Sequence, residues 1–202
     1  MQKPDIHRLI ALHRLLLQFH HIERTVRHPD DFERHETNTE HTFTLAMIAW
    51  MLASYFPELD KNTIIQMALV HDLVEVYAGD TFAYADSVTR AGKPDREAIA
   101  LAKLTSEWPD FPDMIKSIQD YETRQTNEAK FVYALDKLMP IILNYLNQGR
   151  TWQHDNITLE NIKAYKDAKI AKSPEVNEYY QQMIVILQDH PEFFAPSASQ
   201  QR

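Results

Sequence analysis

Apolar residues recur along this chain at spacings of three and four, the period of amphipathic helices, and runs of strict alternation are few. Glycine, which weakens helices, occurs only 3 times. The pattern therefore predicts an all-α fold, an orthogonal helical bundle with helices 38–56, 60–78 and 127–148 at its centre. The other expected helices cover residues 5–25, 95–108, 112–122, 159–172 and 174–190.

Length and connecting segments indicate one domain. Of the 202 residues, we expect residues 1–194 to form a single domain with a C-terminal helical extension, and the polar tail 195–202 to be disordered. Segment 80–94 is the least regular part, and long loops inside compact domains are often functional. Its aromatic residues Phe82 and Tyr84 either stack on a ligand base or anchor the loop, and the sequence leaves both roles open.

Composition excludes several classes of function. The 0 cysteines exclude a thiol nucleophile, a zinc–thiolate site and an iron–sulfur cluster, and they fit a reducing cytoplasm. The glycines stand too far apart for a dinucleotide-binding or phosphate-binding loop. The net charge of -8 argues against a large basic face for nucleic acid, and no apolar run is long enough for a membrane span or signal peptide. We expect a soluble, cytoplasmic protein that binds neither nucleic acid nor membranes.

One apolar stretch holds an adjacent histidine and aspartate, His71 and Asp72, followed by Glu75 and Asp80. A charged aspartate within an apolar helix is unfavourable unless it is paired or bound to a metal. In a continuous helix that ends before Gly79, His71 and Glu75 share one face. An isolated His–Asp pair is commonly an accident of composition, so other parts of the chain must decide its role.

Two further side chains fall on the apolar stripes of other helices. His41 follows Asn38, the expected N-cap of its helix, and Asp136 lies in a later helix. Each alone is explained as well by a hydrogen-bonded core histidine or a salt-bridged core carboxylate. Together with His71 and Asp72, however, they favour one divalent metal site. Nitrogen and oxygen ligands without sulfur suit Mn, Co, Fe, Ni, Mg or Zn.

The order His…His-Asp…Asp, with its surrounding residues, resembles the HD-domain metal-dependent phosphohydrolases, and more closely their bacterial 5′-deoxynucleotidase-like branch. The resemblance implies an HD-domain bundle, a homodimer, one divalent metal ion, and release of phosphate from (deoxy)nucleoside 5′-monophosphates. The similarity covers roughly residues 10–150 and departs from the family at 26–33, where this chain looks longer. It is carried by the stretches Arg34 to His41, His71 to Thr81 and Leu135 to Leu138.

Four more side chains are candidates for the chemistry. Glu75 lies one helical turn beyond the central histidine and is placed to orient or deprotonate a water molecule. Asp80 is the candidate acid or second orienting group, a role that the resemblance also implies. The resemblance further implies that an arginine before the first metal histidine contacts phosphate, and this is Arg34 or, in reserve, Arg24. The basic, histidine-rich segment 20–28 is either an anion-recognition patch that leads into the site or a solvated helix end, and the sequence leaves both open.

Other functions stay open on the same residues. One is a different reaction on this scaffold, phosphodiester hydrolysis or di-iron oxygenation; another is non-catalytic nucleotide binding. A second iron needs further histidines, and none occurs between Asp72 and Asp136. A binding protein has no need of the water-activating carboxylates Glu75 and Asp80. We therefore expect a metal-dependent phosphomonoesterase that acts on a small nucleotide.

Overall fold

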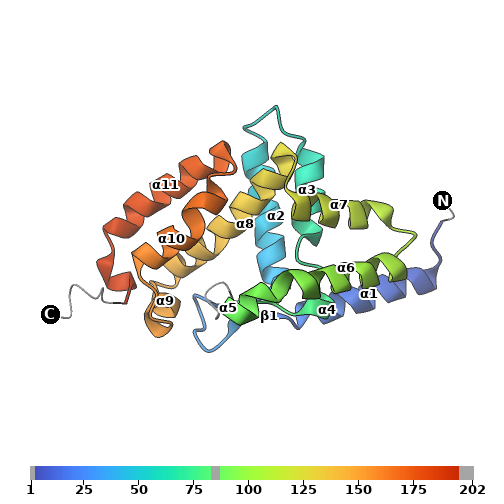
Figure 1. Cartoon of the computed structure of the whole chain (residues 1–202), viewed down its shortest axis with the longest axis horizontal. Coiled ribbons are helices and arrows are strands. Elements are labelled where there is room, and N and C mark those ends of the chain that lie inside the picture. Colours follow the sequence, from blue (N-terminus) through green and yellow to red (C-terminus); the bar gives the residue numbers. More distant parts are fainter. Residues whose placement is uncertain (1–2, 83–86, 196–202) are drawn as a thin grey trace.

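The computed structural model describes residues 3–82 and 87–195, and it is built almost entirely from helices (Figure 1). The all-α prediction is confirmed. Two short strands are the exception within the described residues. The elements are α1 (Ile6–His20), β1 (Glu23–Arg27), β2 (His35–Thr37), α2 (Asn38–Ala53), α3 (Lys61–Val70), α4 (Glu75–Ala78), α5 (Ser87–Ala91), α6 (Lys93–Glu107), α7 (Pro112–Thr123), α8 (Asn127–Leu146), α9 (Arg150–His154), α10 (Leu159–Ile170), α11 (Pro174–Gln188) and a final 3-10 turn, η1 (Pro191–Phe193).

The apolar interior has two parts. The larger part lies between α2, α3 and α8 and extends to α10 and α11, and residues such as Leu45, Ile64 and Leu135 are fully buried in it. The smaller part joins α1, α6 and α7 through residues such as Leu104 and Ile118. Figure 1 shows α2 and α8 in the middle of the molecule, with α10 and α11 on the C-terminal side and α1 and α6 on the other. The three helices expected at the centre therefore lie there.

The chain before α2 differs from the prediction. The first helix ends at His20, not near residue 25, and β1 pairs antiparallel with β2 in the register Glu23 to Thr37 and Arg27 to His35. These strands form a small hairpin ahead of α2. Thr25 and Val26 are β-branched and favour an extended backbone, so the chain continues as a strand and not as a helix. The hairpin sets the direction in which residue 24 leaves the backbone.

The expected helix 60–78 is broken. It consists of α3 and the short α4, joined by a turn over residues 71–74. The Nδ1 atom of His71 donates to the Ala68 carbonyl at 2.9 Å, a side-chain bond that competes with continuation of the backbone ladder. The end at Gly79 is as predicted, because this residue has φ +72°, a conformation that glycine adopts without strain.

The chain after Gly79 differs from the prediction in smaller ways. The segment expected to be a loop, 80–94, contains α5 and the start of α6, and α9 was not predicted. Tyr84 lies outside the described residues, as does the expected disordered tail from residue 196 onward. The N–H of Ala195 donates to the Ile157 carbonyl at 3.2 Å, so this residue is held against the domain. Across the part of the chain that the structure describes, no helix combines the length and apolar character needed to cross a membrane.

Candidate metal centre and active site

The first candidate ligand is placed by the start of α2. Thr37, not Asn38 as expected, is the N-cap, and it forms a capping box with Glu40. His41 is therefore in the first turns of α2 with its ring turned into the core, where it is 1% exposed. The side chain of Asn38 is not used as a cap and instead donates to Glu75 Oε2 at 2.7 Å.

Four side chains of ligand type converge at one point, although they come from α2, the 71–74 turn and α8. Each of His41, His71, Asp72 and Asp136 offers one ligand atom, and these atoms all lie within 4.8 Å of one another. His41 Nε2 is 3.0 Å from Asp136 Oδ1, and His71 Nε2 is 3.1 Å from Asp72 Oδ2 and 3.8 Å from Asp136 Oδ1. The structure thus brings together the complete set that the sequence proposed.

The surroundings of these atoms fit a divalent ion. Donation from His71 Nδ1 to the Ala68 carbonyl leaves Nε2 as the lone-pair nitrogen, and Nε2 is buried with no hydrogen-bond partner among the described residues. The second oxygen of Asp136 accepts from the Tyr121 hydroxyl at 2.9 Å and from Lys137 Nζ at 2.6 Å. Outer hydrogen bonds of this kind orient metal ligands and set the histidine tautomer. Two imidazoles and two carboxylates match a borderline divalent ion.

The protonation states agree with this assignment. Burial and the nearby Arg24 lower the pKa of His41 to about 4, so it is neutral at pH 7, as a ligand must be. Although burial opposes it, neighbouring cations and histidines hold the pKa values of Asp72 and Asp136 below their usual range. Burial also lowers the pKa of His71, but those two carboxylates outweigh burial and raise it to about 10. The same two carboxylates, Asp72 and Asp136, would also attract a divalent ion, which would then take the place of the proton on His71.

Two further carboxylates stand beside the cluster. Glu75 is 2% exposed; it accepts from Asn38 and lies 3.6 Å from Lys93 Nζ. Burial and the nearby Asp72 raise the pKa of Glu75 to about 8, and burial also raises that of Asp80. Glu75 and Asp80 line the same cavity as the metal cluster. Both are suited to holding or passing a proton near neutral pH.

The two candidate arginines have different positions. Arg24 extends from β1 into the cavity, with Nη1 3.0 Å from Asp72 Oδ2 and Nε 3.2 Å from Glu36 Oε2. Arg34 instead binds both carboxylate oxygens of Glu40 at 2.8 Å, is 41% exposed, and does not line the cavity. The structure therefore brings only Arg24 to the site, because the hairpin turns residue 24 inward. Which arginine contacts phosphate stays a prediction, and Arg24 is the candidate that lies beside the ligand cluster.

Sequence reasoning missed several residues of the site. Glu36 is buried between Arg24 and His41, and burial raises its pKa to about 7. Lys137 and Lys93 hold two of the site carboxylates. Glu36 and Lys137 lie inside the stretches that carry the family resemblance, which was the available signal for them. No local pattern points to Lys93, which comes from the first turn of α6.

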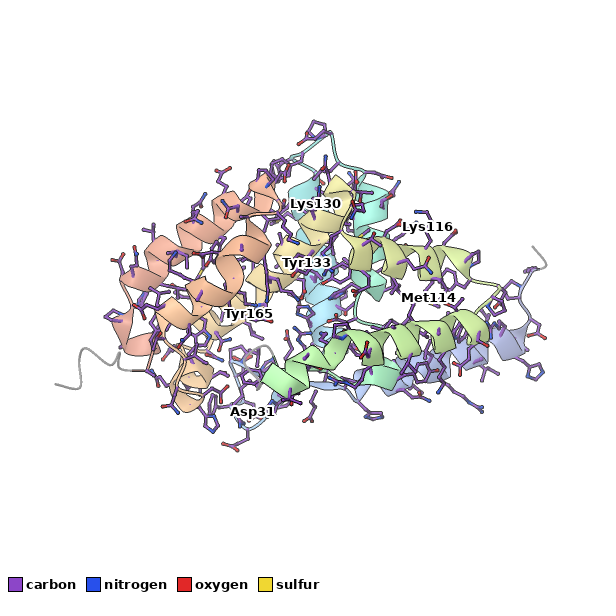
Figure 2. The ribbon with its side chains drawn as sticks, viewed as in Figure 1. Asp31, Met114, Lys116, Lys130, Tyr133 and Tyr165 are labelled. Atoms are coloured by element: carbon purple, nitrogen blue, oxygen red, sulfur yellow. The ribbon has the colours of Figure 1, made fainter. Side chains whose placement is uncertain are left out.

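The metal cluster borders a cavity of about 360 Å³ through its two aspartates, Asp72 and Asp136. We call the part lined by residues of α9, α10 and the loop between them the far end. Figure 2 shows Tyr165 on α10, on the side of that helix that faces the middle of the molecule. Phe82 also lines the cavity, so an aromatic residue from the irregular segment does reach the site. Far-end lining residues are Thr151, Trp152, Asp155, Ile157, Ile162, Tyr165, Lys166 and Lys169.

The protein is thus an almost all-helical domain that buries a cluster of two histidines and two aspartates suited to a divalent metal ion. The chain belongs to the HD-domain family, since the family model described as HD domain matches residues 17–177. The resemblance seen in the sequence is confirmed by this match.

Similar proteins point the same way. The 5′-deoxynucleotidase HDDC2 of Bos taurus is 33% identical over 138 residues, which is 66% of this chain and 65% of the relative, and that of Homo sapiens is 31% identical over 138 residues, with the same shares. The chain thus spans about two thirds of the length of these relatives. A crystal structure described as a predicted metal-dependent phosphohydrolase from Magnetospirillum magnetotacticum MS-1 is 29% identical, with a TM-score of 0.77 over 94% of this chain and 96% of that one. A conserved hypothetical protein from Pyrococcus furiosus, 21% identical with a TM-score of 0.62 over 86% and 98%, supports the fold alone.

Proposed function

We propose that this protein is a divalent-metal-dependent phosphomonoester hydrolase that releases phosphate from deoxynucleoside 5′-monophosphates. One observation carries the proposal: the His41, His71, Asp72 and Asp136 ligand cluster opens into the same cavity as Glu75, Asp80 and Arg24. The similarity to proteins named 5′-deoxynucleotidase supports the nucleotide class.

The ligand cluster would hold one divalent ion per chain, from among Mn, Co, Fe, Ni, Mg and Zn. When bound, such an ion supplies Lewis acidity toward a phosphoryl oxygen and lowers the pKa of water toward about 7. Asp136 is held in place for this role by Tyr121 and Lys137.

The chain's own residues supply the remaining steps. The Arg24 guanidinium, already turned into the cavity, binds the phosphate oxygens as a fork and favours a dianionic monoester over a diester. Glu75 orients the attacking water and accepts its proton as the new oxygen–phosphorus bond forms. Asp80 gives a proton to the 5′-oxygen as the phosphorus–oxygen bond breaks. Raised pKa values in both carboxylates suit these transfers.

The test is phosphate release after chelation and re-addition of Mn, Co, Mg or Ni. We expect metal-dependent turnover of deoxynucleoside 5′-monophosphates and poor turnover of 3′-monophosphates and cyclic nucleotides. Equal rates on cyclic nucleotides would favour a phosphodiesterase. No release from any nucleotide, with binding retained, would favour a nucleotide-binding protein.

We also propose a cytoplasmic homodimer built from one domain over residues 1–194. Apolar side chains exposed on α1 and α2 support self-association: Leu9, Phe43, Trp50 and Met51 are each at least half exposed. Light scattering on the parent and on Trp50→Glu tests the dimer. A monomeric parent would reject it.

A further inference from the structure

The far end of the cavity is rich in cations. Lys166 and Lys169 line it from α10, and Lys137 lines the cavity from the facing helix α8. Among the described residues, the carboxylate of the far end is Asp155, and it lies 2.7 Å from Nδ1 of its neighbour His154. Asp155 thus pairs with His154, and in the described part of the chain no ion pair joins it to Lys166.

Lys166 is the residue that most needs an explanation. It is 5% exposed, and no described carboxylate lies within ion-pair distance of its amino group. Burial, with Lys137 nearby, lowers the pKa of Lys166 to about 7. One turn earlier on the same helix, Lys163 is 38% exposed and pairs with Asp167 at 3.4 Å. A buried cation without a counter-charge is unfavourable unless something else supplies that charge.

We propose that Lys166, with Lys137 and Lys169, forms a second anion subsite, so that the preferred substrates are deoxynucleoside 5′-phosphates that carry a second phosphate, such as a 3′-phosphate. This inference rests on the proposed function, because it places the 5′-phosphate at the metal centre. The second phosphate supplies the counter-charge that Lys166 lacks.

The chemistry at the metal centre is unchanged. Water oxygen bonds to the 5′-phosphorus, the bond to the 5′-oxygen breaks, and the 3′-phosphate leaves intact on the nucleoside. Lys166 acts on binding alone, because it lines the far end of the cavity and forms no ion pair with a metal ligand in the described part of the chain.

The test compares 2′-deoxyadenosine 3′,5′-bisphosphate with 2′-deoxyadenosine 5′-monophosphate in the metal-loaded full chain. One charge-assisted hydrogen bond between Lys166 and the second phosphate should raise kcat/KM for the bisphosphate about tenfold over that for the monophosphate. Lys166→Met, which replaces the cation with an unbranched apolar side chain one atom shorter, should reduce that preference at least threefold. Lys163→Met on the exposed face of the same helix is the matched control and should keep it. A parent preference below threefold, or equal preferences in the two variants, would overturn the inference.

A binding measurement separates this inference from the proposed function. Calorimetry with 2′-deoxyadenosine 3′-monophosphate and with deoxyadenosine needs no turnover. We expect the 3′-nucleotide to bind more tightly, and its advantage to fall in Lys166→Met but not in Lys163→Met. Free inorganic phosphate as competitor shows whether the subsite takes phosphate alone; an effect of free phosphate without any bisphosphate preference would also overturn the inference. Absent hydrolysis with this binding pattern intact rejects only the proposed function.

Discussion

The two ends of the cavity use similar charged side chains in different ways. At the metal end each cation meets an acid: Arg24 lies beside Asp72, Lys137 beside Asp136 and Lys93 beside Glu75. At the far end, Lys166 is buried without a described carboxylate partner.

The paired cations at the metal end stabilise the arrangement of the site, whereas an unpaired buried cation is suited to binding an anionic ligand. Paired buried charges keep their positions without a ligand, although such pairs need not add net stability. An unpaired buried charge lowers stability in the free protein and gains most when an anion arrives. The following variants test that distinction, from the largest expected effect to the smallest.

The largest effect is expected at the metal ligands. His71→Ala combined with Asp136→Ala removes an imidazole and a carboxylate from a four-residue cluster, so activity should fall to the level of the chelated parent. Metal analysis should find one equivalent per chain in the parent and none in the double variant. The matched control is His190→Ala with Glu192→Ala, an exposed histidine–acid pair. Two equivalents in the parent, or full retention in the double variant, would contradict a single-ion site.

The next effect concerns proton transfer. Glu75→Gln keeps the shape of the side chain and its acceptor for Asn38, but it cannot accept a proton. Turnover should drop about 10² to 10⁴-fold while metal content is unchanged, because general acid–base groups contribute that range. Glu97→Gln, which removes the other acid next to Lys93, is the control. Loss of metal in Glu75→Gln would instead make Glu75 a ligand.

A smaller effect is expected at the phosphate-binding arginine. Arg24→Ala should lower kcat/KM for 5′-monophosphates about 10 to 100-fold, the value of one or two charge-assisted hydrogen bonds. Arg34→Ala breaks an exposed pair with Glu40 and should change kcat/KM less than about twofold, since such pairs contribute little. Steady-state kinetics with metal content measured in parallel decides between them. A larger effect at Arg34 would restore the ranking expected from the sequence.

The last effect is on stability alone, leaves the chemical step untouched and depends on pH. A lysine that titrates at about 10.4 when unfolded and about 7 when folded takes up a proton on unfolding between these pH values, so the parent becomes less stable as pH falls from 10 to 7. Lys166→Met removes this penalty. Its advantage should be greatest at or below pH 7 and shrink by on the order of 1 kcal/mol per pH unit toward pH 10.

Urea denaturation of the parent, Lys166→Met and Lys163→Met at pH 6 to 10 measures this difference. The groups that set the pKa of Lys166, besides burial, are Lys137 and Asp136 on α8, Lys169 on α10 and Arg24 on β1. Lys166 would not be a destabilising buried cation if Lys166→Met were less stable than the parent at pH 7. The same conclusion would follow if the difference in free energy of unfolding between the two proteins did not change with pH.

Much of the fold and the candidate ligand set followed from local sequence pattern. Apolar spacing predicts helices because a helix repeats every 3.6 residues, and it placed His41 and Asp136 on buried faces. The His71–Asp72 pair and the acids after it could be recognised because they lie in or directly after an apolar stretch. Local apolar spacing predicts which face of a helix is buried. A charged side chain on that face is unfavourable without an ion-pair, hydrogen-bond or metal partner, so its presence indicates a site.

Tertiary structure decided the rest. The inward turn of Arg24 and the pairing of Lys93 with Glu75 depend on residues distant in sequence. The break at His71 coincides with a side-chain bond to Ala68, which the apolar spacing does not report. Lys166 lies within the helix expected over residues 159–172, and it is buried because α10 packs against α8. Whether a charged side chain is paired, exposed or buried alone is fixed by its neighbours in space, because desolvation and Coulomb interactions act through distance in the fold and not through position in the chain.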